Sequence, residues 1–346
     1  MSYTTNKRNA ALSISRIVGM IFIVICHIIN YYTFIPMSDS LPQFFNCGVP
    51  IFIFISGYLY GGKFIHNFKK WYLQRIIIIA MPAIILSIVM IIILSSIGEK
   101  ISINSIIAYC LSLEGLLFIA GDISSMFFKY IPGLGHLWFI TIIIICYLLI
   151  PVLQKVSSKS MHPTRFLIVF FLVASVISIV ISNYCSLFYF VIFATGYFSK
   201  RINLLERVNT SFLLIYTAIF FAAILGRLLL QQTMDGTSVY SSYVAISHLF
   251  VGTWFVVLFS FLNNKFPTIL TKIADLKVTK LFDSYSFYIY LTHGVLCIDT
   301  FNVYEFFSLP LATILFFGGT IISTFLLKYI SDIINKVLYK KIPILK

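Results

Sequence analysis

Two ionisable residues, Arg16 and His27, interrupt the apolar run from Ser13 to Tyr32. Eleven residues are close to three helical turns, so on a helix both side chains fall within about 20° of one face and about 16 Å apart along the axis. Titratable side chains inside a membrane helix are costly and usually face a polar cavity, which favours a functional role. Alternatively, the Arg16 side chain extends to the membrane surface, and His27 belongs to an interfacial belt with Tyr31.

A second polar pattern lies near the C-terminus, in the segment SYSFYIYLTHGVL. Ser286, Tyr290 and His293 stand at positions i, i+4 and i+7, which places them on one face of a helix. Such a stripe is more consistent with a lined cavity than with lipid contact. Histidine suits general-base chemistry on a hydroxyl group, because its pKa lies near the working pH.

The segment GLGHLWFI brings His136 and Trp138 to the start of another apolar run. A tryptophan at such a position is usually an interfacial anchor. Alternatively, Trp138 stacks on a sugar ring while His136 hydrogen-bonds the sugar hydroxyls. Arg227 and His248 are weaker candidates, and Arg227 stands near a helix end from which its side chain can reach the membrane surface.

The segment FISGYLYGGK contains Ser56 and Gly57, small residues that permit close approach of two helices. The basic run KKWYLQR follows, with Lys69, Lys70 and Arg75. Basic clusters next to a membrane helix commonly bind anionic lipid. A cofactor that carries phosphates would need such a cluster too, although the cluster alone does not show one.

Composition limits the class of protein that these residues belong to. Of the 346 residues, 60% are hydrophobic and only 10% are charged, and the mean hydropathy is +0.99. These values predict an all-α polytopic membrane protein. The formal charge of +14 is explained by the excess of Lys and Arg in cytoplasmic loops and implies no nucleic acid partner. The six cysteines form no CxxC or Cys/His spacing, so we expect no metal site.

The apolar runs predict a single domain, residues 1–346, with a bundle of about ten transmembrane helices. Twenty-one Lys and Arg residues fall in loops on one side and two on the other, which predicts cytoplasmic N- and C-termini in a plasma or inner cell membrane. We expect the spans at 12–32, 44–60, 74–97, 137–153, 166–183, 185–199, 211–230, 240–262, 281–298 and 309–330, with the fifth and sixth forming a hairpin around Asn183–Tyr184.

The long segment 98–136 is expected outside the membrane core, with residues 101–120 forming an interfacial or re-entrant helix. No pair of carboxylates is expected inside the membrane. The expected absence of buried Asp and Glu argues against an ion-coupled transporter.

Four ordered blocks make the sequence similar to the acyltransferase-3 family of bacterial membrane O-acyltransferases. The resemblance covers nearly the whole chain. The blocks are Arg16 and His27 with ten residues between them, GVPIFIFISGYL (Gly48–Leu59), HLWF (His136–Phe139) and SYSFYIYLTH (Ser284–His293).

The resemblance implies an enzyme that moves an acyl group, commonly acetyl from cytoplasmic acetyl-CoA, to a hydroxyl of a surface or lipid-linked glycan. It implies that His27 is the catalytic base or the acyl carrier and that Arg16 acts on the donor side. We expect acetyl-CoA to be bound by Arg16, Lys69, Lys70, Arg75 and Ser56. We expect the acceptor glycan to be bound by His136, Trp138, Tyr290 and His293.

Two positions depart from the family pattern. Ser13 stands where many members carry an acidic residue, so an orienting Asp–Arg pair is expected to be missing. Ile79 stands where a further arginine is common. Two other functions fit the sequence: a lipid-linked sugar flippase or polysaccharide exporter, and a scaffold subunit of an envelope complex. Membrane lipids are partners in every case, and the sequence leaves open whether the protein forms a homo-oligomer.

Overall fold

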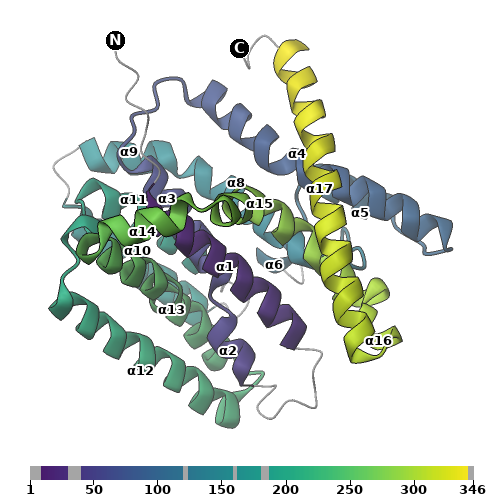
Figure 1. Ribbon diagram of the computed structural model, residues 1–346. Helices are drawn as coiled ribbons and strands as arrows, with labels where there is room; N and C mark the ends of the chain where they lie inside the picture. Colours follow the sequence, from purple (N-terminus) through teal and green to yellow (C-terminus); the bar gives the residue numbers. More distant parts are fainter. Residues whose placement is uncertain (1–8, 30–39, 120–123, 159–161, 181–186, 342–346) are drawn as a thin grey trace.

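The structure is a computed structural model that describes residues 9–29, 40–119, 124–158, 162–180 and 187–341 (Figure 1). Within these ranges the regular structure is helical, without strands. The longer helices are α1 (Ala10–Ile29), α3 (Gly48–Tyr60), α4 (Phe68–Ser96), α8 (Trp138–Leu148), α10 (Pro163–Val180), α11 (Leu187–Arg201), α12 (Thr210–Met234), α13 (Ser238–Lys265), α15 (Lys277–His293) and α17 (Leu309–Lys341).

Shorter elements connect them: α2 (Leu41–Phe45), α5 (Ile103–Cys110), α6 (Leu116–Ile119), α9 (Ile150–Ser158), α14 (Pro267–Asp275) and α16 (Val303–Phe306), with 3₁₀ turns at Gly135–Leu137, Leu205–Arg207, Gly294–Leu296 and Asp299–Phe301.

Helix α1 lies in the middle of the bundle, packed against α3, α13 and α15. Helices α12 and α17 lie at opposite edges (Figure 1). Both edge helices expose large apolar side chains, such as Leu214 and Phe221 on α12 and Ile314 and Ile322 on α17. A surface of this kind suits contact with lipid rather than with water.

Among the described residues, seven segments are long and apolar enough to cross a membrane, so the chain is a multi-pass membrane protein. Each of the ten predicted spans overlaps a helix, but α10, α11 and α15 are too short or too polar to meet that criterion. Helix α15 begins with lysines, which lowers its hydropathy. The predicted hairpin at Asn183–Tyr184 lies outside the described residues.

The prediction of close helix packing at Gly57 is confirmed. A β-carbon at Gly57 would overlap the backbone of α11 at Phe193, and one at Gly196 would overlap the backbone of α3 at Phe54. The two helices therefore touch backbone to backbone, as small residues allow in a membrane.

The two ends of the bundle differ in chemistry. At one end, the last turns of α3, α11 and α13 lie together: Lys200 covers the Tyr58 ring, and the Asn264 amide donates to the carbonyl of Leu205. We call this the basic end, because it carries Lys63, Lys200, Arg207 and Lys265. The opposite end, which holds the first turns of α8 and α13 and the last turns of α1 and α15, is called the histidine end.

The segment expected to form one helix over 101–120 is instead broken. Helix α5 ends at Cys110, and Ser112 adopts a left-handed conformation with φ of 53°. The turn is held against α8, because the Thr141 hydroxyl donates to the carbonyl of Ser112 and accepts from the N–H of Gly115. Residues 101–120 therefore contain two short helices, α5 and α6, in place of the single interfacial or re-entrant helix that their hydropathy allows.

Candidate functional site

Three histidines from distant parts of the chain meet at the histidine end. His27 closes α1, His136 lies in the 3₁₀ turn before α8, and His293 closes α15. The His27 and His293 rings lie 5.2 Å apart between centroids, and the His136 and His293 rings 5.3 Å. We call these three residues the histidine cluster. Three of the four sequence blocks contribute one member each.

The hydrogen bonds of His136 and His293 fix their tautomers. His136 Nε2 lies 2.8 Å from the carbonyl oxygen of Leu291, and His293 Nδ1 lies 2.7 Å from that of Tyr290. A carbonyl only accepts, so each of these nitrogens carries the ring proton. The other nitrogens, His136 Nδ1 and His293 Nε2, are then acceptors, and both are buried without a hydrogen-bond partner. The cluster therefore offers two acceptors to a donor such as a hydroxyl group.

His27 differs from its two neighbours in access. It is partly exposed, whereas His136 and His293 are buried. Among the described residues, no hydrogen bond is formed by the His27 ring. A histidine that is accessible and unbonded is free to bind a proton from a bound molecule.

Gly294 makes room for the cluster. Its backbone is helical, with φ of −61°, but a β-carbon there would overlap the His136 ring. We expect Gly294→Ala to displace His136, to destabilise the fold by about 1–3 kcal/mol through overpacking, and to lower activity. Gly135→Ala is the matched control, because a β-carbon beside His136 at that position meets no atom within 4 Å. Thermal unfolding and activity of the two variants test this, and equal behaviour would contradict it.

The predicted polar stripe on α15 faces protein and not lipid. Ser286, Tyr290 and His293 are all buried. The Tyr290 hydroxyl donates to the carbonyl of His136, and its ring contacts those of His136, Phe139 and His293. Tyr290, predicted to bind acceptor, therefore also holds His136 in place.

Arg16 has a carboxylate partner, contrary to the expectation that an orienting pair is missing. Its Nε lies 2.7 Å from Asp283 Oδ1 and its Nη2 lies 2.8 Å from Oδ2, a bidentate pair. The carboxylate comes from α15 rather than from position 13 on α1. Arg16 and His27 both contact α15, through Asp283 and His293, so their predicted common face is confirmed. Asp283 stands three residues before Ser286, and that spacing could have revealed it.

The remaining residues predicted to bind the donor lie at the basic end, in two places. Arg75 lies 5.7 Å from the Tyr60 ring centroid, and Tyr60 packs on Tyr147, beside Ser56. Arg75 Nε is buried and has no hydrogen-bond partner.

Lys69 and Lys70 lie in the first turn of α4, which the Asn67 side chain caps, and Lys69 is exposed. The structure thus brings Ser56 and Arg75 together, whereas Arg16 pairs with Asp283 on α15.

Trp138 does not present a free face as predicted for sugar stacking. Its ring stacks on Phe118 at 4.3 Å and lies 5.3 Å from the Tyr189 ring. Any sugar contact at this point must therefore involve the aromatic group as a whole rather than Trp138 alone.

Glu114 is a buried carboxyl group that was not among the site residues predicted from the sequence. It is 1% exposed, and neither carboxylate oxygen has a hydrogen-bond partner. Burial raises the pKa of Glu114 to about 8. Together with Asp283, whose side chain is 5% exposed, it corrects the expectation that buried carboxylates are absent. The two carboxyl groups sit in different environments and form no pair.

Glu114 makes the stability of the fold depend on pH. From its ordinary pKa of 4.5 up to about 8, the folded protein keeps a proton that the unfolded chain has released. The free energy of unfolding therefore falls as pH rises through this window. We expect Glu114→Gln to raise the unfolding temperature by a margin that grows from about pH 5 to about pH 8. Exposed Glu99→Gln is the control, and a margin that stays constant with pH would contradict this.

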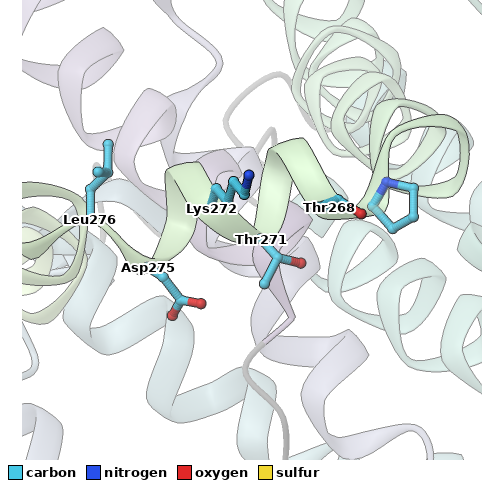
Figure 2. Close-up of a pocket in the computed structure, with 6 residues that line it drawn as sticks. Thr268, Thr271, Lys272, Asp275 and Leu276 are labelled. Atoms are coloured by element: carbon cyan, nitrogen blue, oxygen red, sulfur yellow. The ribbon is translucent and has the colours of Figure 1, made fainter.

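A separate hollow lies on α14 at the basic end (Figure 2). Thr271 and Asp275 project from the same side of the helix, and Asp275 pairs with Lys280. A neighbouring face of α14, about 100° around the helix, packs on α1 through Leu270 and Ala274. None of the predicted site residues lines this hollow.

The comparison with protein families covers the part of the chain that contains these residues. The family model of the acyltransferase domain (Acyl_transf_3) matches residues 9–331, which include the histidine cluster, Arg16 and Asp283. No curated protein and no solved structure matches the chain significantly. A match of this length, on a helical bundle with several membrane-spanning helices, shows the family. The chain belongs to the acyltransferase-3 family of membrane acyltransferases.

Proposed function

We propose that this protein is an O-acetyltransferase of a plasma or inner cell membrane. It transfers an acetyl group from cytoplasmic acetyl-CoA to a hydroxyl of a surface or lipid-linked glycan. The observation that carries the proposal is the histidine cluster, in which two buried ring nitrogens without donors lie beside an accessible His27.

The cluster supports attack by a hydroxyl on an acyl carbon. His27 accepts the hydroxyl proton while the hydroxyl oxygen forms a bond to the thioester carbonyl carbon. The carbon–sulfur bond then breaks, and the CoA thiolate leaves and takes up the proton from His27. In a two-step variant, the His27 ring nitrogen itself receives the acetyl group and passes it to the hydroxyl. His136 and His293 orient the acceptor by accepting hydrogen bonds from its hydroxyls.

The charge distribution gives the transfer a direction. The basic end faces the cytoplasm by the positive-inside rule, and the histidine end faces outward. Phosphates of the donor would bind near Arg75 and near Lys69 and Lys70 in the first turn of α4. The Arg16–Asp283 pair stands between the two ends, on the same face of α1 as His27.

Thioester turnover by the purified protein tests the function. Protein in lipid nanodiscs is mixed with acetyl-CoA and the glycan fraction of the native membrane, and release of the CoA thiol is followed with the mass of the glycan. We expect thiol release that requires glycan, together with a gain of one acetyl group per event. A flippase or exporter needs no acyl donor, so glycan movement without thiol release would remove the enzyme reading.

A further inference from the structure

A second pocket, of about 390 Å³, opens at the histidine end, separate from the histidine cluster. It lies between α2, α6 and the first turns of α8, α11 and α13. Its lining includes three aromatic residues, Phe118, Trp138 and Tyr189, and three residues with polar groups, Gln43, Tyr240 and His248, here called the polar wall. Trp138 stands two residues after His136, so the pocket and the cluster share one turn of chain.

Behind the polar wall lies Arg227, which is 0% exposed. The expectation that its side chain reaches the membrane surface is wrong. Among the described residues, no carboxylate forms an ion pair with it. A buried guanidinium is stable only if its donors are satisfied. Arg227 Nε donates to Ser247 Oγ at 2.6 Å. Nη1 donates to the carbonyls of Gln43 at 2.7 Å and Asn46 at 3.4 Å. Nη2 donates to the carbonyl of Val244 at 3.4 Å and to His248 Nδ1 at 2.6 Å.

Arg227 decides which nitrogen of His248 carries the proton. A guanidinium only donates, so Nδ1 accepts from Arg227 Nη2. Nδ1 also lies 2.7 Å from the carbonyl of Val244, but the two lone pairs of that carbonyl already accept from the Ser247 hydroxyl and from Arg227 Nη2. The ring proton of His248 is therefore on Nε2, at the edge of the ring turned away from Arg227. His248 thus offers the pocket an N–H donor, with an uncompensated positive charge behind it.

The same pocket has an acceptor for a hydroxyl group. Gln43 Oε1 is buried and has no hydrogen-bond partner. Aromatic rings in the lining, an N–H donor with a cation behind it and an amide oxygen together fit a sugar ring that carries a negative group. A neutral sugar would leave the positive charge of Arg227 uncompensated.

We propose that this pocket binds an acidic sugar of the acceptor, with its carboxylate or phosphate oxygens facing His248 Nε2 and a hydroxyl donating to Gln43. The proposal rests on the proposed function, because it names the class of glycan that the enzyme accepts. His248 contacts the anion, and Arg227 is a positioning residue that acts through His248.

Equilibrium binding tests the pocket without any acyl donor. Methyl glucuronide and methyl glucoside differ only in the carboxylate, and each is titrated by calorimetry into the full-length protein in lipid nanodiscs. A hydrogen bond to a charged group predicts that the glucuronide binds at least about tenfold more tightly. Methyl glucoside 6-phosphate forms the second arm: if it binds more tightly than the glucuronide, the anionic group is a phosphate.

Two variants separate the pocket from the fold. His248→Asn keeps an oxygen near the position of Nδ1 for Arg227 but removes the Nε2 donor, so we expect the preference for acidic sugars to disappear. Ser241→Asp places a carboxylate on the pocket wall in the first turn of α13, where helix ends favour an acid. We expect it to weaken glucuronide binding at least about tenfold and to leave glucoside binding unchanged.

Equal binding of the two sugars by the wild type, or an unchanged preference in both variants, would overturn the proposal. Selective binding without thioester turnover would support the pocket while it removes the proposed enzyme function. Thioester turnover without selective binding would support the enzyme function and overturn the proposal for the pocket.

Discussion

Replacing His27 by alanine is expected to lower kcat/KM for acetyl transfer by a factor of about 100 to 10,000, the usual contribution of a general base. His27 is the accessible member of the histidine cluster, and its ring has no hydrogen-bond partner among the described residues. The loss of its side chain should therefore cost little stability. Thiol release from acetyl-CoA, measured beside thermal unfolding, checks both parts of the prediction.

The control for this variant is His66→Ala. His66 is exposed in the loop before α4, at the basic end, and its ring lies 4.6 Å from the Phe64 ring. It should retain wild-type turnover. If His27→Ala kept wild-type turnover too, the histidine cluster would have no part in the chemistry, whatever the family.

The second large effect is expected at the pair of Arg16 and Asp283. Removing Arg16 takes a bidentate partner from the carboxylate of Asp283, whose side chain is 5% exposed, which costs on the order of 3 kcal/mol of folding stability. Asp283→Ala should cost a comparable amount, because the guanidinium of Arg16 then loses its bidentate partner. Both single variants should also lose turnover, so they cannot separate a structural role of Arg16 from a role toward the donor.

Exchanging the two residues separates the structural role of Arg16 from its role toward the donor. The double variant Arg16→Asp with Asp283→Arg restores an ion pair across α1 and α15, so we expect most of the lost stability to return. If Arg16 also contacts the donor, its position matters and turnover should stay at least about tenfold low. Recovery of both stability and turnover would show that the pair is structural. Unfolding temperature and the KM for acetyl-CoA are the two measurements.

The helical nature of the chain and the residues of its main site could be predicted from sequence. Long apolar runs leave a membrane chain no alternative to helices, because every backbone group must be hydrogen-bonded within the membrane. The eleven-residue spacing of Arg16 and His27 fixes a common face by helix geometry alone. The stripe of Ser286, Tyr290 and His293 follows in the same way.

Other features could not be read from spacing, because they depend on which helices become neighbours. Asp283 pairs with Arg16 although 267 positions separate them in sequence. Arg227 is buried because α2 places two carbonyls against it. The break at Ser112 is stabilised by Thr141, a residue of another helix. Each of these is a contact between elements far apart in the chain.

The sequence by itself thus determined that this protein crosses the membrane several times, that one end is basic, and that histidines stand near helix ends. Those properties depend on local periodicity and on the cost of placing charge in lipid. The tertiary structure decided that three of those histidines meet, which of their nitrogens stay without donors, and that a guanidinium lies behind the second pocket. Burial and hydrogen-bond partners are properties of packing, so only the folded arrangement of the helices fixes them.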